Sequence, residues 1–437
     1  MKFLSDVKKI HFIGIGGIGM SAMAKFMRHH GVMVTGSDLL ESPITNDLKE
    51  NYDINVYIGV LPENVSVNHD MIVYSPAVPI NNIERSEGRN LSLREYSYPE
   101  LLGKISEEKT TIAISGTNGK TTTTTMLVEV MKHLGTDPTA IVGEYLQKYN
   151  SNFVAGQSEY FITEACEYKE SFLNIQHNIL LITNITEDHL DYFENLEHIQ
   201  NSFIKLLNNK KDIGVLVCNT KLIELQPIIK RAHELEMEII NYSEYFNDQL
   251  TLPIPGNHNL QNAAAALGII EALGLSIKES QNYLARQFQG AKRRMEHIGM
   301  TEHGAQLFDD YAHNPEGLNY LINGLRDFYP EKKIVMLFEP HLYSRTRDFA
   351  QEFATILELV DVLYLFPTYR AREKQIPEED YLLENYINSK NVELIKILDK
   401  QNFKEQFESK QYTTDYIVIT VGAGDIWQQG LEIKKNH

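Results

Sequence analysis

Lys120 and Thr121 stand directly after a glycine turn at 116–119, an order typical of a loop that holds phosphate groups. Backbone N–H groups of such a turn point inward, the lysine ammonium reaches the outer phosphates, and the threonine hydroxyl contacts Mg²⁺. Gly-Lys-Thr also occurs in ordinary tight turns, but here a β-branched stretch precedes the turn and an apolar helix face follows it. The sequence therefore predicts that the chain binds ATP or GTP through Gly116, Thr117, Asn118, Gly119, Lys120, Thr121 and Thr122.

A second glycine pattern follows a short strand expected at 9–13 and contains Gly14, Gly16, Gly17 and Gly19. A helix is expected over 20–30, and a second strand over 32–38 ends in Asp38. This order resembles a dinucleotide-binding unit, in which the backbone approaches a diphosphate and the acidic residue suits a ribose hydroxyl. The alternative is a tight turn between strand and helix that binds nothing. The complete context favours binding of a diphosphate.

Polar residues end two of the strands expected after the nucleotide loop. The strand at 160–165 gives Glu164 and Glu167, and the strand at 179–185 is followed by Asp188 and His189. Open α/β sheets bind their ligands at the carboxyl ends of strands, so these side chains are expected beside the loop. A Glu and a His there would bind Mg²⁺ between phosphate and substrate, although His is a less usual ligand of this cation. The alternatives are a helix N-cap for Asp188 and a structural hydrogen bond for His189.

Two further groups come later in the chain, and the second of them lies close to the expected junction of the second and third domains. Asn259 and Asn262 are three residues apart at the start of an alanine-rich helix expected over 261–273, so both can face one ligand. They suit the edge of an adenine ring, or they cap the helix. Arg294 belongs to a triplet of basic residues that is either a solvated surface or a source of charge for a γ-phosphate.

The elements that position these residues alternate between strand and helix through the whole chain, which predicts an α/β fold of three tandem domains. We expect domains at 1–106, 107–291 and 292–437, the first and third Rossmann-like and the second with a mostly parallel sheet around the nucleotide loop. Further strands are expected at 71–74, near Ser92, at 215–218 and at 238–242. The third domain should contain strands at 307–313, 333–341, 362–366 and 416–421, with a helix beginning at Asn314 and Pro315.

Composition excludes several classes of protein. The chain has 437 residues, a formal net charge of -18 and two cysteines. The negative charge argues against a general nucleic-acid or membrane surface. Two cysteines cannot form a disulfide framework, and no apolar run approaches the ~18 residues of a membrane span. We expect a cytoplasmic protein without a signal peptide, either monomer or homodimer.

Taken together, the motifs resemble those of the Mur ligases, which build the peptide stem of bacterial peptidoglycan. The resemblance is greatest to the members that add L-alanine to UDP-N-acetylmuramate, and it covers nearly the whole chain. The stretches that carry it are HFIGIGGIGMSAMA (11–24), GTNGKTTTTTM (116–126), EACEYKESF (164–172), TNITEDHLDYF (183–193), PGNHNLQNAAAA (255–266), KRRME (292–296), DDYAHNP (309–315), EPHLYSRTRDFA (339–350) and VGAGDI (421–426).

The resemblance assigns roles to residues. Lys120, Glu164, His189 and Arg294 would be catalytic, with Thr121, Glu164 and His189 as the Mg²⁺ ligands. ATP would also be contacted by Asn259, Asn262 and Asp310. The N-terminal glycine loop would hold the UDP of a sugar nucleotide instead of NAD, through Gly14, Gly16, Gly17, Gly19, Ser37, Asp38 and Ser75. The amino acid would be bound by Tyr311, His313, His341 and Arg345.

The implied reaction suits this set of residues. A carboxylate is a poor electrophile, so ATP would phosphorylate the lactyl carboxylate, and the amino group of alanine would attack the resulting acyl phosphate. Two anions must meet in the first step, and Mg²⁺, Lys120 and Arg294 would offset their repulsion.

Three positions differ from the usual pattern of these ligases, and three other functions stay open. Asn118 and Asn314 stand where histidine is usual, and Leu342 where arginine is common. Related ligases that add later residues carry a carbamylated lysine where this chain has Phe203, which favours the alanine enzyme. The open alternatives are a ligase that attaches a recycled tripeptide to the same UDP-sugar, a nicotinamide-dependent oxidoreductase, and a nucleotide switch without catalysis.

Overall fold

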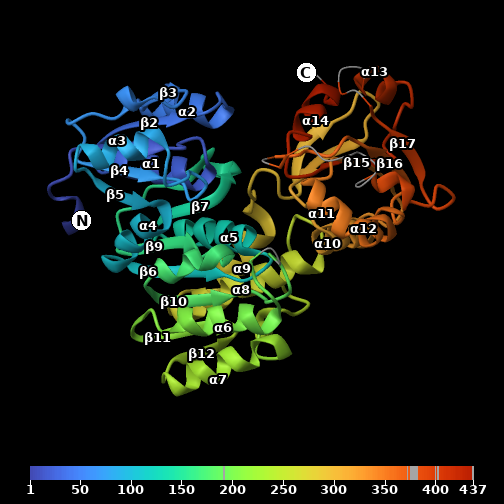
Figure 1. Ribbon diagram of the computed structural model, residues 1–437. Helices are drawn as coiled ribbons and strands as arrows, with labels where there is room; N and C mark the ends of the chain where they lie inside the picture. The colour runs from blue at the N-terminus through green and yellow to red at the C-terminus, as the bar shows by residue number, and fades with distance from the viewer. Residues whose placement is uncertain (190–191, 372, 375–381, 399, 401–402, 436–437) are drawn as a thin grey trace. The chain divides into compact units, whose positions relative to one another are not determined.

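A computed structural model describes residues 1–189, 192–371, 373–374, 382–398, 400 and 403–435. It contains three sheets, mostly parallel, with helices between the strands, so the predicted α/β class is confirmed (Figure 1). The chain forms two compact units, one of Met1–Thr251 with Leu260–Gly290, the other of Leu252–Asn259 with the described chain from Ala291 onward. The polypeptide therefore passes between the units at 251/252, 259/260 and 290/291. No helix among the described residues is long and apolar enough to cross a membrane.

The first sheet of unit 1 is fully parallel, with strand order β3-β2-β1-β4-β5. The strand expected near Ser92 begins at Arg94, and Ser92 itself lies in the turn after α3 with φ +56°. The elements are β1 (Lys9–Ile13), α1 (Ile18–His29), β2 (Met33–Asp38), α2 (Pro43–Tyr52), β3 (Asn55–Ile58), β4 (Met71–Tyr74), α3 (Ile83–Asn90), β5 (Arg94–Ser97) and α4 (Tyr98–Glu107).

The second sheet of unit 1 has the order β12-β11-β10-β6-β9-β7-β8, and only β8 runs antiparallel to its neighbour. Strands β6 and β10 are buried along nearly their whole length, as parallel strands in the middle of a covered sheet are. The strands are β6 (Thr110–Ser115), β7 (Thr139–Leu146), β8 (Ser151–Val154), β9 (Tyr160–Glu164), β10 (His177–Ile182), β11 (Lys210–Cys218) and β12 (Glu238–Asn241). The helices are α5 (Lys120–His133), α6 (Leu196–Leu207), α7 (Gln226–Glu234), α8 (Asn257–Ala272) and α9 (Ile277–Gln287).

The two sheets of unit 1 are joined through α1, which packs on β7 and β8. Lys25 on α1 is fully buried, and its ammonium contacts Asp47 at 2.7 Å and the Asn152 side chain on β8 at 2.9 Å. Asn152 accepts from Lys25 through Oδ1, and its Nδ2 donates to the carbonyl of Ile18 in the first turn of α1. Because the two sheets are tied in this way, dividing unit 1 into domains at 1–106 and 107–291 stays a proposal, as does the third domain at 292–437.

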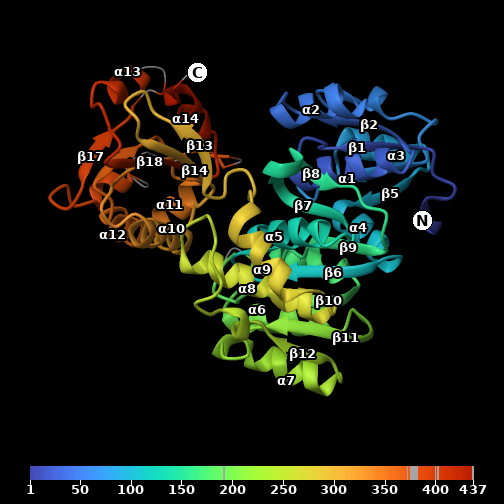
Figure 2. The same cartoon turned by 180° about the vertical axis from the view of Figure 1, so that it is seen from behind.

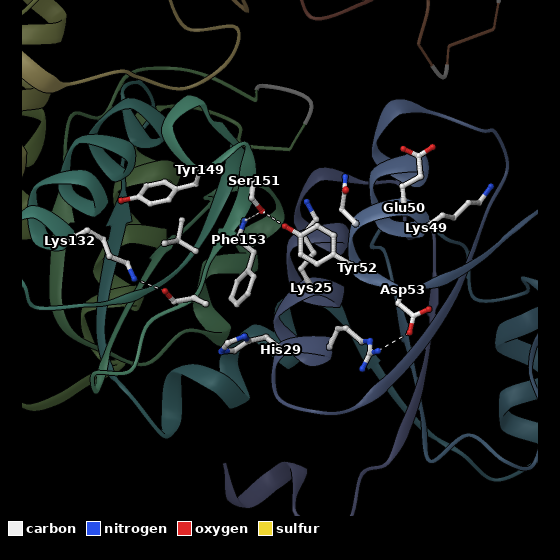
Figure 3. A pocket seen from close by; sticks show the side chains of 14 residues that line it. Lys25, His29, Lys49, Glu50, Tyr52, Asp53, Lys132, Tyr149, Ser151 and Phe153 are labelled. Carbon is white, nitrogen blue, oxygen red and sulfur yellow. Dashed lines mark hydrogen bonds and ion pairs between the residues drawn. The ribbon is translucent and has the colours of Figure 1, made fainter.

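A cavity of about 730 Å³ opens in unit 1 where the ends of α1 and α2 face β8 and Lys132 of α5 (Figure 3). Its charged side chains are largely paired: Arg28 with Asp53, and Lys132 with Asp137. The Tyr52 hydroxyl meets Ser151 Oγ at 3.0 Å across it. None of its lining residues belongs to the nucleotide loop at 116–119 or to the N-terminal glycine loop at 14–19.

Unit 2 is built on a sheet of order β13-β14-β18-β15-β16-β17, in which only β13 is antiparallel. Asn314 caps α10, because its side chain accepts the amide hydrogen of Gly317 at 2.8 Å, so the predicted helix start at Pro315 is confirmed. The strands are β13 (Glu296–Met300), β14 (Gln306–Asp310), β15 (Lys333–Phe338), β16 (Val362–Leu365), β17 (Glu393–Lys396) and β18 (Tyr416–Val421). The helices are α10 (Pro315–Phe328), α11 (Tyr343–Asp348), α12 (Ala350–Leu357), α13 (Phe403–Glu408) and α14 (Trp427–Ile433).

Candidate active site

Three adjacent parallel strands of the second sheet, β9, β6 and β10, end at the same edge of unit 1. The nucleotide loop follows β6 and leads directly into α5, which contacts β6, β7 and β9 (Figure 2). Glu164 is the last residue of β9, and Asn184 follows β10. The sheet thereby places the expected acidic residue beside the loop, at the edge where open α/β sheets bind ligands.

The loop is shaped by two glycines and by the chain after β10. Gly116 and Gly119 have φ of +123° and +87°, a region that disfavours other residues. A Cβ at Gly116 would lie 2.1 Å from Thr183 Oγ1, and one at Gly119 would lie 2.2 Å from Asn262 Oδ1. Asn184 accepts the amide hydrogen of Asn118 at 3.0 Å. The loop is therefore held tightly from two sides, and Asn262 lies directly against it.

Lys120 points back into the loop, where its ammonium donates to the carbonyl oxygens of Gly116 and Thr117. Both carboxylate oxygens of Glu167 also accept from it, at 2.9 and 3.0 Å. Burial alone would lower the pKa of Lys120, but the neighbouring charge of Glu167 outweighs it and the pKa is raised. From the sequence, Glu167 was recognised as a polar residue after its strand but was given no role. Nothing in the neighbouring sequence indicates that it pairs with Lys120, which lies far away in the chain.

The expected metal ligands lie around the same loop. Thr121 Oγ1 donates to Glu164 at 3.0 Å, and the other carboxylate oxygen of Glu164 accepts the amide hydrogen of Gly143 at 2.7 Å. His189 Nε2 lies 3.9 Å from Glu167, and the His189 ring is 4.7 Å from that of Tyr168. Hydroxyl and carboxylate oxygens are the ligands that Mg²⁺ prefers, so Thr121 and Glu164 fit this ion. Within the described residues no three His, Cys, Asp or Glu side chains already form a metal-binding group.

The N-terminal glycine loop is fastened to the end of β2. The amide of Gly14 donates to the carbonyl of Ser37 at 2.9 Å, and the amide of Gly16 donates to Asp38 Oδ2 at 2.8 Å. Ser37 is fully buried and donates its hydroxyl hydrogen to Glu84 at 2.5 Å. Ser75, after β4, donates its amide hydrogen to the carbonyl of Ile13. The predicted UDP-sugar residues thus come together at one edge of the first sheet.

The two asparagines of α8 fall in different units: Asn259 ends a segment of unit 2, and Asn262 belongs to unit 1. Asn259 donates its side-chain amide to the carbonyl of Pro255 at 2.6 Å. Their joint contact with a nucleotide stays a prediction.

In unit 2, Arg294 lies over the Tyr311 ring with its guanidinium carbon 5.1 Å from the ring centre. Its Nε is buried and has no partner among the described residues. Both Asp310 oxygens accept backbone amides, from Ala312 and from Met295, each at 2.8 Å. These contacts turn the chain after Asp310, so β14 ends there and the strand expected to reach 313 is wrong at its end.

Tyr311, His313, His341 and Arg345, the acceptor cluster, also lie together in unit 2. The rings of Tyr311 and His313 are 5.2 Å apart, and those of His313 and His341 are 5.9 Å apart. Burial, followed by the charge of Arg345, lowers the pKa of His313 to about 3 and that of His341 to about 4. One guanidinium nitrogen of Arg345, Nη1, is buried without a partner in the described chain. The cluster therefore combines neutral imidazoles with a cation, an arrangement that suits a carboxylate ligand.

Family models match residues 9–110 as "Mur ligase family, catalytic domain", 114–248 as "Mur ligase middle domain" and 293–424 as "Mur ligase, glutamate ligase domain". The UDP-N-acetylmuramate–L-alanine ligase of Clostridium kluyveri is 37% identical over 97% of each chain. The structure of UDP-N-acetylmuramate-alanine ligase from Thermotoga maritima is similar, with a TM-score of 0.80, 25% identity and coverage of 97% of this chain and 98% of that one. A murein peptide ligase from Psychrobacter arcticus shares the fold, with a TM-score of 0.70, 20% identity and coverage of 98% of both chains.

Proposed function

Since this chain belongs to the Mur ligase family, we propose that it joins L-alanine to the lactyl carboxylate of UDP-N-acetylmuramate. The reaction consumes ATP and supplies a precursor of peptidoglycan. The observation that carries the proposal is the 37% identity to an alanine ligase over 97% of both chains. The nucleotide loop, Glu164 and the acceptor cluster support it, because they provide the chemical groups that this reaction requires.

The chain's own residues would act mainly by placing charge. Lys120 and Arg294 would offset the repulsion between the lactyl carboxylate and the γ-phosphate while the acyl phosphate forms. Thr121, Glu164 and His189 would hold Mg²⁺, which supplies additional positive charge at the phosphates. Asn259, Asn262 and Asp310 would contact ATP, and the N-terminal glycine loop the UDP group. These residue roles are proposals drawn from the family resemblance and the geometry within each unit.

The acceptor cluster would bind the amino acid before its amine attacks the acyl phosphate. Arg345 suits the α-carboxylate, because a guanidinium pairs with a carboxylate through two parallel hydrogen bonds. Leu342, which precedes α11 with φ +71°, supplies no charge where related ligases commonly have arginine. Acceptor breadth is therefore the finer question, with glycine and L-serine as the natural competitors of L-alanine.

One assay tests the proposal against the tripeptide-recycling alternative. Phosphate release from ATP is measured with UDP-N-acetylmuramate and, in turn, L-alanine, glycine, L-serine and the tripeptide. We expect L-alanine to give the highest kcat/KM. A higher value for the tripeptide would contradict the alanine assignment, and absence of phosphate release together with oxidation of a nicotinamide would contradict ligase function. The family resemblance also implies a cytoplasmic location, which we propose for this chain. Light scattering would decide between monomer and homodimer.

A further inference from the structure

Glu167 pairs with the Lys120 ammonium, which is the group that would bind the nucleotide phosphates. A lysine ammonium has three hydrogens to donate. The Lys120 ammonium contacts four acceptors, namely two carbonyl oxygens of the nucleotide loop and both carboxylate oxygens of Glu167. The side chains are 15% and 3% exposed, so water contributes little to this arrangement. Every donor of Lys120 is therefore directed at the protein.

The partners of Lys120 differ in how easily they can leave. The carbonyls of Gly116 and Thr117 belong to the loop itself, and Thr117 is fixed further because its amide donates to the Asn184 carbonyl at 3.0 Å. Glu167 is a side chain in the segment after β9, outside the loop. A phosphate oxygen that binds Lys120 must replace an existing acceptor, and Glu167 is the one that a side-chain rotation can remove.

We propose that Glu167 is a positioning residue that acts through Lys120: its carboxylate holds the ammonium in the loop and is displaced by the outer phosphates of the nucleotide. The inference rests on the proposed function, because it takes ATP as the ligand of the loop. Displacement of Glu167 opposes nucleotide binding, since a charge-assisted pair must be broken first. Once displaced, the Glu167 carboxylate is a buried anion close to His189. A buried anion is costly unless a cation pairs with it.

The test compares nucleotide affinities, so that no turnover is needed. Dissociation constants for ATP, ADP and AMP are measured by calorimetry for the wild type, Glu167→Gln and Glu170→Gln. Glu170 is the matched control, because it lies three residues further on and pairs with Lys205 and Ser202 instead of Lys120. We expect Glu167→Gln to tighten ATP and ADP binding roughly fivefold, which corresponds to about 1 kcal/mol, because a hydrogen bond to a charged group is stronger than a neutral one by about that amount. AMP lacks the outer phosphates, so its affinity should not change, and Glu170→Gln should match the wild type for all three.

A double variant separates action through Lys120 from direct repulsion of the phosphates. In a Lys120→Met background, Glu167→Gln should no longer alter ATP affinity. The same tightening in that background would overturn the proposal, as would weaker or unchanged ATP binding by Glu167→Gln alone. Glu167→Asp, with a carboxylate shorter by one methylene, provides a second variant if the first does not fold, and it should give a smaller tightening. A wild-type chain that binds no ATP would contradict the proposed function and this inference together.

Discussion

Replacing Gly119 by alanine should weaken ATP binding in addition to destabilising the protein. Gly119 has φ +87°, and placing an L-residue in this left-handed region costs about 1–2 kcal/mol. The new Cβ would lie 2.2 Å from Oδ1 and 3.1 Å from Cγ of Asn262, far inside van der Waals contact. Asn262 is only 7% exposed, so its side chain cannot move away without disturbing its neighbours. The loop amides that should face the phosphates must shift instead.

Gly135 provides the matched control for this substitution. It has φ +78°, and a Cβ there would meet nothing within 4 Å. Gly135→Ala should therefore lose about 1–2 kcal/mol of unfolding free energy from backbone strain alone. Gly119→Ala should lose at least as much and also weaken ATP binding about tenfold or more, which corresponds to roughly 1.4 kcal/mol. Calorimetry with ATP and thermal unfolding measure the two effects. Equal ATP affinities in the two variants would refute the assigned position of the loop.

The remaining predictions concern phosphate charge, metal, acceptor and pH. Lys120→Ala should fold normally yet lose ~100-fold or more in phosphate release, because it removes about 3 kcal/mol of charge stabilisation; near-normal release would refute the assignment. Glu164→Ala and His189→Ala should both raise the Mg²⁺ concentration needed for half-maximal rate. If the rate depends on Mg²⁺ as in the wild type, both residues have a structural role instead. Arg345→Ala should raise KM for L-alanine far more than KM for ATP; equal effects would remove it from the acceptor cluster. Burial lowers the pKa of His177 to about 4. Below about pH 6.5 the unfolded chain therefore binds a proton at this histidine that the folded chain does not bind. Unfolding stability should thus fall by up to about 1.4 kcal/mol per pH unit from pH 6.5 towards 4, and His177→Gln should show a shallower decline.

Local signals in the sequence were sufficient where a feature depends on neighbours in the chain. The strand, glycine turn and helix around Lys120 were predicted because each is specified within a few residues, and α5 indeed begins at Lys120. The same is true of α10, which is specified by its Asn-Pro start. The end of β14 was missed, since it depends on which backbone amides the Asp310 carboxylate accepts.

Long-range pairs could not be predicted in this way. Glu167 is separated from Lys120 by 47 residues, and only the order of β9 beside β6 brings them together. Asn152 reaches Lys25 across 127 residues. Polar residues after a strand indicate which edge of a sheet carries a site, but the partner of each side chain is determined by the packing of the whole unit. The site residues taken from the family resemblance stay predictions until they are tested by substitution.

The triple passage of the chain between its units limits how the protein can be divided. A fragment that stops after Gly290 would still carry 252–259, which packs with unit 2: the His258 ring lies 5.7 Å from that of Tyr320, and a Cβ on Gly324 would lie 3.0 Å from Gly256. In such a fragment these eight residues would remain attached to unit 1 without the unit 2 residues that they pack against. During synthesis residues 252–259 leave the ribosome long before most of unit 2 has been made. Unit 1 can therefore fold before these residues pack with unit 2. A soluble fragment of unit 1 should therefore need a short polar linker from Thr251 to Leu260, and unit 2 should need 252–259 returned to it, for example by fusion ahead of Ala291.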